Sequence, residues 1–261
     1  MDIVQFKILF IVAVLSVGLL VGLTPTLTHV TARHERIFSM GNALGGGVFL
    51  GAGLIHLLPD AINNYTGLLS PSLNYPLASL ICAVGFMLVL LIEKVIVGGD
   101  EERHVAEASQ SRGAVYPYVL ALVLSVHSFI ADMALGAESR LATSAALFIA
   151  IIAHQGVAAF ALGVGLQRGK TPRSQSIGII GLFSLTTPVG ILSGTVLGAF
   201  LSGRAEQWFE GIFDALAAGT FLYVAVVDII EGEFSRHMDL KLKFSLVLLG
   251  LAIMALIAVW A

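Results

Sequence analysis

Charged residues and cysteines are scarce in this chain. Lysine, arginine, aspartate and glutamate make up 12% of its 261 residues, about half of the share usual in soluble domains. The basic residues form no nucleic-acid footprint, so we expect no nucleic-acid partner. Cys82, the one cysteine, excludes an intramolecular disulfide and a metal site built from several thiolates. The sequence also lacks a His-Glu-x-x-His pair, which argues against a zinc enzyme of that type.

Long apolar runs dominate what remains. Hydrophobic residues account for 57% of the chain, and its mean hydropathy is +0.93. A helix of about 20 apolar residues spans the hydrocarbon core of a bilayer. We therefore expect an all-α membrane protein with eight transmembrane helices, forming a single domain over residues 1–261 in the lipid bilayer. The expected helices cover residues 3–23, 38–60, 76–97, 115–137, 142–166, 176–200, 208–231 and 240–261.

Basic residues are distributed unequally between the two sides of this arrangement. Eleven of the 14 lysines and arginines fall in connections after odd-numbered helices, and Lys7, Arg140 and Arg204 fall on the other side. Because cytoplasmic connections carry the excess of positive charge, both termini are expected outside the cytoplasm. The longest cytoplasmic connection is expected at about residues 95–114. The expected location is a cell membrane, either the plasma membrane or a bacterial inner membrane.

A ten-residue pattern occurs twice, each time in the middle of an apolar run. It reads His127-Ser-Phe-Ile-Ala-Asp-Met-Ala-Leu-Gly136 and then His154-Gln-Gly-Val-Ala-Ala-Phe-Ala-Leu-Gly163. The two runs predict an antiparallel helix pair, which places both imidazoles near mid-membrane depth. An ionisable side chain there costs about 2–3 kcal/mol on insertion scales and marks an ion path, proton relay or substrate site. A lone histidine also serves as an interhelical hydrogen-bonding group, but two at matched depth favour a site.

Further polar residues accompany the two histidines. Asp132 follows His127 by five residues, which places it ~7.5 Å farther along the helix and ~140° around it. It is only ~40° from Ser128, so Ser128 and Asp132 are expected to share one face. Gln155 follows His154 directly. These five side chains are the candidate metal ligands.

Acidic residues and another histidine stand near the ends of the expected helices. Carboxylates at a mouth attract cations, and neutral imidazoles suit Zn²⁺, Fe²⁺ and similar ions. The same charges have a simpler interpretation as solvated groups at helix ends. The candidate entrance residues are His56, Asp60, Glu138 and Asp214, and the candidate exit residues are Asp228 and Glu231.

Five segments together resemble the Zrt/Irt-like (ZIP) family of metal transporters. They are Gly47–Ala61, His127-Ser128 with Ala134–Gly136, His154–Gly156, Phe183–Gly190 and Ala217–Ala225, in the family's order. The resemblance implies a ZIP-type helix bundle, usually a homodimer. It also implies import of Zn²⁺, and in some members Fe²⁺, Mn²⁺ or Cd²⁺, into the cytoplasm. The metal is then the transported substrate, and neither a cofactor nor an enzymatic activity is expected.

The chain departs from the family pattern at three positions. The histidines and the polar residue after each match the family's ligands in helices 4 and 5. Ala131 and Ala158 stand where many members have glutamate, and Thr187 stands where members with a two-metal site have glutamate. Asp132, one position past Ala131, is therefore expected to supply the missing negative charge.

Two other classes of protein remain open at this point. One is a metal sensor or receptor of ZIP architecture without transport, which the two alanines favour. The other is an intramembrane metalloenzyme, which is disfavoured because catalysis would need a general base beside the metal. Uptake of radiolabelled metal by proteoliposomes distinguishes a transporter from both.

Overall fold

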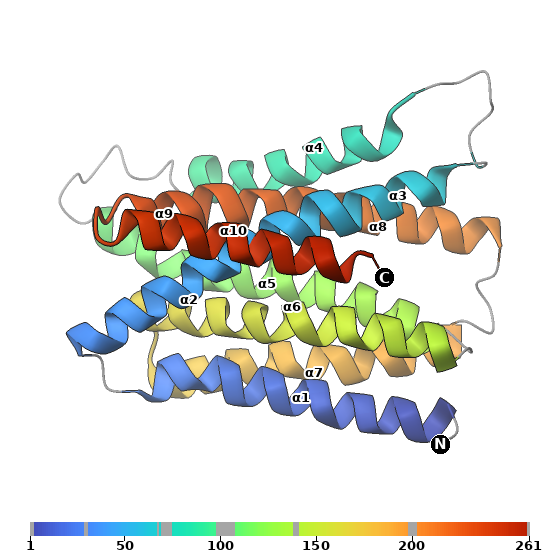
Figure 1. Ribbon diagram of the computed structural model, residues 1–261, viewed down its shortest axis with the longest axis horizontal. Helices are drawn as coiled ribbons and strands as arrows, with labels where there is room; N and C mark the ends of the chain where they lie inside the picture. Colours follow the sequence, from blue (N-terminus) through green and yellow to red (C-terminus); the bar gives the residue numbers. More distant parts are fainter. Residues whose placement is uncertain are drawn as a thin grey trace.

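The helices of the molecule run side by side along its long axis (Figure 1). The computed structural model describes residues 3–28, 31–66, 68, 75–97, 108–137, 141–197 and 203–259, whose regular secondary structure is helical. The N- and C-termini lie at the same end of the bundle (Figure 1). The α-helices are α1 (Ile3–Leu27), α2 (Ala32–Gly51), α3 (Leu58–Tyr65), α4 (Leu77–Leu90), α5 (Ala108–Ala137), α6 (Leu141–Arg168), α7 (Arg173–Leu197), α8 (Arg204–Tyr223), α9 (Glu231–Phe234) and α10 (Leu240–Ile257). Among the described residues, three π-helical segments, η1 (Ala52–Leu57), η2 (Leu91–Val97) and η4 (Val224–Ile230), continue α2, α4 and α8.

Several helices extend beyond the apolar runs that predict them. The stretch α2–η1–α3 is helical over residues 32–65, where 38–60 was expected. α5 begins at Ala108, inside the segment 95–114 expected as a loop, of which residues 98–107 lie outside the described residues. Hydropathy detects only the part of a helix in the hydrocarbon core, whereas polar first turns continue it outward. In α2 the Thr31 hydroxyl accepts a hydrogen bond of 3.3 Å from the His34 amide and so caps the polar start.

Six helical stretches in the described parts of the chain are long and apolar enough to cross a membrane. α5 and α6 are not among these six, and the apolar stretch found in α5 is the shorter Pro117–Phe129. The fold is therefore that of an all-helical, multi-pass membrane protein. The six stretches are Val4–Leu27, Ala32–Tyr65, Leu77–Ile96, Arg173–Val196, Gln207–Phe234 and Leu240–Ile257.

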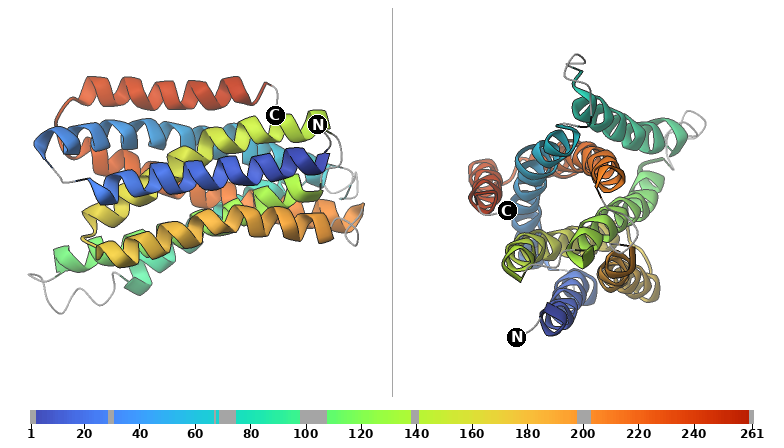
Figure 2. Two further views of the ribbon diagram at one scale, coloured as in Figure 1. Left: turned by 90° about the horizontal axis from the view of Figure 1, so that it is seen from below. Right: turned by 90° about the vertical axis from the view of Figure 1, so that its right-hand side faces the viewer.

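The helices pack as two groups. α1, α5, α6 and α7 contact one another extensively, and we call them the α1/α5 group. The remaining helices, together with the π segments, contact one another in the same way and form the α2/α8 group. The groups occupy the lower and upper halves of the end-on view in Figure 2. They meet mainly where α2 packs on α6 and where α5 packs on α8.

Glycines bring helices of the α2/α8 group close together. A Cβ atom at Gly47 of α2 would lie 2.0 Å from the Val247 carbonyl oxygen of α10. A Cβ atom at Gly219 of α8 would lie 1.9 Å from the Cys82 carbonyl oxygen of α4. Apolar helices gain no hydrophobic free energy by leaving lipid for one another, so close van der Waals packing of this kind stabilises their association.

Candidate functional site

Two buried histidines lie side by side where α5 packs on α6. The ring centroids of His127 and His154 are 5.6 Å apart, and the residues are 6% and 3% exposed. Phe221 of α8 packs on the His127 ring at 4.3 Å between centroids. No hydrogen-bond partner for His127 Nε2 is found among the described residues. A neutral imidazole has one nitrogen with a free lone pair. When Nε2 is that nitrogen, it is suited to bind a metal ion inside the bundle.

Ser128 links the two histidine-bearing helices. Its Oγ lies 3.1 Å from Asp132 Oδ2 and 3.1 Å from Gln155 Oε1. A hydroxyl has one proton, which it donates to one oxygen at a time, and an ionised carboxylate is the stronger acceptor. When the Gln155 amide turns its Nε2 toward Ser128, the serine accepts from Gln155 and donates to Asp132, and both contacts are satisfied.

Asp132 is fully buried on the side of α5 that faces α7. A Cβ atom at Gly190 of α7 would lie 2.9 Å from Asp132 Cβ, so the two helices touch there. The Thr187 side chain, also on α7, is near enough to interact with the carboxylate. Within the described part of the chain, Asp132 Oδ1 has no hydrogen-bond partner. Burying a carboxylate with an unused oxygen costs free energy, which points to a functional role at this depth.

The histidine pair and Asp132 lie next to each other, but they do not form a single metal-binding site with three or more ligands. Over the described ranges, three or more His, Cys, Asp or Glu side chains do not come together in a group able to hold a metal ion. Ala158, at one of the positions where the family often has glutamate, is 3% exposed in the hydrophobic core. The side chain of Ala131 lies outside the described residues.

Three of the four candidate entrance residues lie together at one end of the bundle. His56 Nδ1 is 2.9 Å from Asp60 Oδ2, one helical turn away. Asp214 of α8 is near enough to interact electrostatically with both. His56 is also near enough to His127 to influence it electrostatically. Glu138 lies outside the described residues.

The candidate exit residues belong to a second acidic cluster. Asp228 of η4 interacts with Glu231 and with Glu93 of η2. Lys94 Nζ is 2.7 Å from Glu93 Oε1, and the buried Tyr223 side chain interacts with both Glu93 and Asp228. Sequence reasoning missed Glu93, although an acidic residue within the third apolar run was itself a signal.

Each π-helical segment in the described part of the chain carries at least one residue of the two clusters. His56 lies in η1, Glu93 in η2 and Asp228 in η4. π-helical turns are rare and occur frequently at functional sites. Hydrophobic periodicity gives no signal for them, so the sequence did not predict them.

Buried imidazoles with acidic clusters toward both ends of an apolar helix bundle define a membrane transporter. A family model described as ZIP Zinc transporter matches residues 4–104 and 97–258. The chain belongs to the ZIP zinc transporter family, which consists of transporters rather than enzymes.

Curated relatives resemble the chain over nearly its whole length. Zinc transporter ZIP2 of Mus musculus is 32% identical over 98% of this chain and 98% of its own length. Zinc transporter ZIP2 of Homo sapiens is 28% identical over 95% and 96% of the two chains. Zinc transporter ZIP1 of Homo sapiens is 30% identical over 96% of this chain and 89% of its own. The likeness therefore covers the histidine pair and both acidic clusters.

Proposed function

We propose that this protein imports divalent transition-metal ions into the cytoplasm, with Zn²⁺ as the main substrate and Fe²⁺, Mn²⁺ or Cd²⁺ as alternatives. The observation that carries the proposal is the buried pair His127 and His154, in which His127 Nε2 has no hydrogen-bond partner among the described residues. Imidazole nitrogen is a borderline ligand that suits Zn²⁺, and a site at mid-membrane depth suits a transported ion. The names of the relatives, all zinc transporters, support the same choice of metal.

The proposed path begins at His56, Asp60 and Asp214, where carboxylates attract the ion and remove part of its hydration shell. The ion then passes to the histidine pair, with Ser128, Asp132 and Gln155 beside it. Asp132 supplies negative charge that the imidazoles lack. Asp228 and Glu231, with Glu93, assist release at the other end.

The proposed architecture has eight membrane spans. The six apolar stretches account for α1, α2–α3, α4, α7, α8–α9 and α10, and we add α5 and α6, which pack among them. Both termini then lie outside the cytoplasm of a plasma membrane or bacterial inner membrane. A homodimer is the proposed assembly, as the family resemblance implies.

Uptake of radioactive zinc into proteoliposomes that contain only this protein tests the proposal. We expect uptake that saturates with zinc and that falls to the level of protein-free liposomes in His127→Ala and in His154→Ala. Arg33 is exposed and far from the pair along the chain, so the Arg33→Gln variant serves as the control and should transport zinc normally. Zinc binding without any uptake by the unmodified protein would instead identify a sensor or receptor. Normal uptake in both histidine variants would place the transport site elsewhere.

A further inference from the structure

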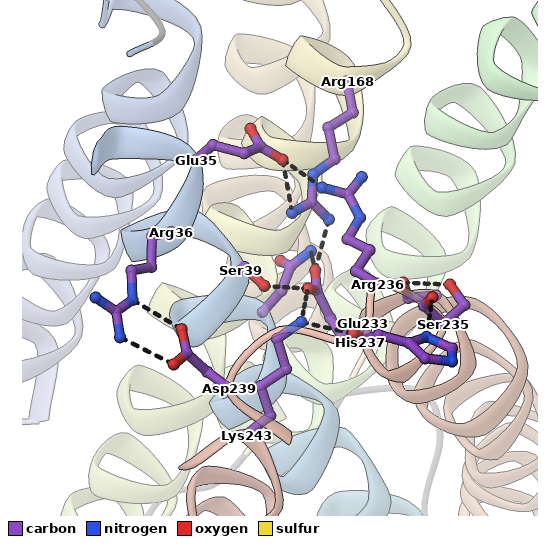
Figure 3. A network of polar contacts seen from close by, with 12 residues as sticks. Glu35, Arg36, Ser39, Arg168, Glu233, Ser235, Arg236, His237, Asp239 and Lys243 are labelled. Atoms are coloured by element: carbon purple, nitrogen blue, oxygen red, sulfur yellow. Dashed lines mark hydrogen bonds and ion pairs between the residues drawn. The ribbon is translucent and has the colours of Figure 1, made fainter. Parts of the chain in front are cut away.

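A buried carboxylate, Glu233 of α9, is the centre of a polar network (Figure 3), and α9 lies at the end of the bundle opposite the termini (Figure 1). It is 1% exposed and accepts hydrogen bonds from the Ser39 hydroxyl and, at 3.1 Å, from Asn42 Nδ2. Lys243 Nζ is 3.6 Å from Glu233 Oε2 and donates to the Glu233 carbonyl at 2.6 Å. Arg168 Nη1 donates to Glu233 Oε1 at 2.6 Å.

A second carboxylate extends the network toward solvent. Glu35 of α2 receives a hydrogen bond of 2.5 Å from Arg236 and lies 3.3 Å from Arg168 Nη2 (Figure 3). Arg168 therefore pairs with Glu233 and with Glu35 at the same time. Its planar guanidinium is suited to such two-fold pairing.

Arg168 belongs to the other helix group from its two partners. It ends α6 of the α1/α5 group, whereas Glu35 and Glu233 belong to α2 and α9 of the α2/α8 group. Closer to the middle of the bundle, apolar side chains of α6 pack against glycines of α2. A Cβ atom at Gly41 would lie 2.4 Å from Phe160 Cε1, and one at Gly45 would lie 3.1 Å from Val157 Cγ1. Neither of these two contacts is ionic, so the ion pairs of Arg168 are a separate, polar link between the groups at this end.

The network is arranged so that Arg168 can leave without creating an unpaired buried charge. An isolated buried charge is costly, which would make an ordinary buried ion pair hard to open. Glu233, however, keeps Ser39, Asn42 and Lys243, all from its own group. Glu35 keeps Arg236, and the Arg168 side chain, at 22% exposure, is accessible to water.

We propose that Arg168, Glu233 and Glu35 form a reversible ionic latch, which fixes the two helix groups against each other in this conformation and must open in each transport cycle. This proposal rests on the transport function proposed above. The latch shifts the equilibrium between conformations by as much as it stabilises this one. Its loss therefore increases the population of a conformation in which the two groups are apart at this end.

Double electron–electron resonance measures that population directly. Spin labels at Ser174→Cys on α7 and Ser235→Cys after α9 are exposed and lie in different helix groups. We expect Arg168→Gln to raise the population of a second, longer distance by about 5-fold or more. Glu35→Gln, which removes one arm of the latch and leaves Glu233 intact, should have a smaller effect. Arg33→Gln, which removes an exposed positive charge near the start of α2, is the matched control and should have none. An unchanged distance distribution in Arg168→Gln would overturn the latch.

Cross-linking tests whether opening is required. In a Cys82→Ala background, Glu35→Cys with Arg168→Cys is treated with a short bis-maleimide that contains a reducible disulfide. We expect zinc uptake to stop on cross-linking and to return after reduction, with no effect in the single-cysteine variants. Undiminished uptake by the cross-linked protein would overturn the requirement for opening. If the unmodified protein takes up no zinc, the transport function fails, while the resonance measurement needs no metal and still decides whether the latch exists.

Discussion

In the proposed metal site, the charge balance depends on one residue, Asp132. Two uncharged imidazoles would leave the charge of a bound dication unneutralised. The family's glutamate positions hold Ala131 and Ala158, so no carboxylate comes from there. Asp132 is 0% exposed, and one of its oxygens receives a hydrogen bond from Ser128. The other oxygen has no partner in the described structure and is the one we expect to act on the ion.

Asp132→Asn keeps the size of this side chain and removes its charge. We expect zinc uptake at limiting concentration to fall about 10-fold or more, the loss typical when a group that supports metal ligands is removed. Initial rates over a range of zinc concentrations in proteoliposomes measure this. Ser128→Ala, which leaves the charge in place, should lose less. Adding Ala131→Glu to Asp132→Asn restores a carboxylate one turn from His127 and should recover part of the rate. A normal rate in Asp132→Asn alone would show that this carboxylate has only a structural role.

At the scale of helices, some glycines lie where two helices touch, and others have open space beside them. Gly47 lets α2 touch the backbone of α10, and Gly250 on α10 does the same from the other side, since a Cβ atom there would lie 2.2 Å from the Leu44 carbonyl oxygen. Gly178 on α7, in contrast, has no atom within 4 Å of an added Cβ. From the sequence alone the three positions cannot be told apart, because each is a glycine in an apolar helix.

Gly47→Ala should therefore destabilise the protein, and Gly178→Ala should not. The added methyl group at Gly47 must push α2 and α10 apart, at a cost of about 1–3 kcal/mol, as for other overpacked sites. At Gly178 the same change only improves helix propensity, by about 1 kcal/mol. The midpoint of thermal unfolding in detergent should fall by several degrees in the first variant and stay equal or rise in the second. Equal midpoints in the two variants would contradict the close packing of α2 on α10.

For the whole molecule, the position of the termini and the distribution of basic residues point to the same orientation. Both termini lie at the end of the bundle where α3 and the start of α8 lie (Figure 1). Arg36, Arg168, Arg236 and Lys243 belong to the polar network around Glu233 of α9 (Figure 3), and α9 lies at the opposite end (Figure 1). Under the positive-inside rule these basic residues support the proposed orientation, in which that opposite end faces the cytoplasm.

Cysteine labelling in intact cells tests this orientation. In a Cys82→Ala background, Tyr75→Cys before α4 should react with a membrane-impermeant maleimide added outside. Ser235→Cys, after α9, should react only once the membrane is permeabilised. Both positions are exposed, and the cysteine-free protein is the control. The reverse pattern of labelling would mean that the protein is inserted the other way round.

The sequence by itself determined that this is a helical membrane protein, and it indicated most of the candidate site residues. Apolar runs long enough for a bilayer require helices, because lipid offers no hydrogen bonds to the backbone. The repeated histidine pattern placed His127 and His154 at matching depth, and helical spacing placed Ser128 beside Asp132, a contact that the structure contains at 3.1 Å. Each of these inferences uses only local geometry.

The tertiary structure decided what lies between helices far apart in the chain. Three contacts depend on which helix faces touch. Asp132 faces α7, Glu93 lies near Asp228, and Arg168 of α6 pairs with Glu233 of α9. In a membrane both faces of a helix are apolar, so hydrophobic periodicity does not tell the lipid-facing side from the packed side. The π segments and the buried network around Glu233 likewise have no local signal, because they arise from packing against neighbouring helices.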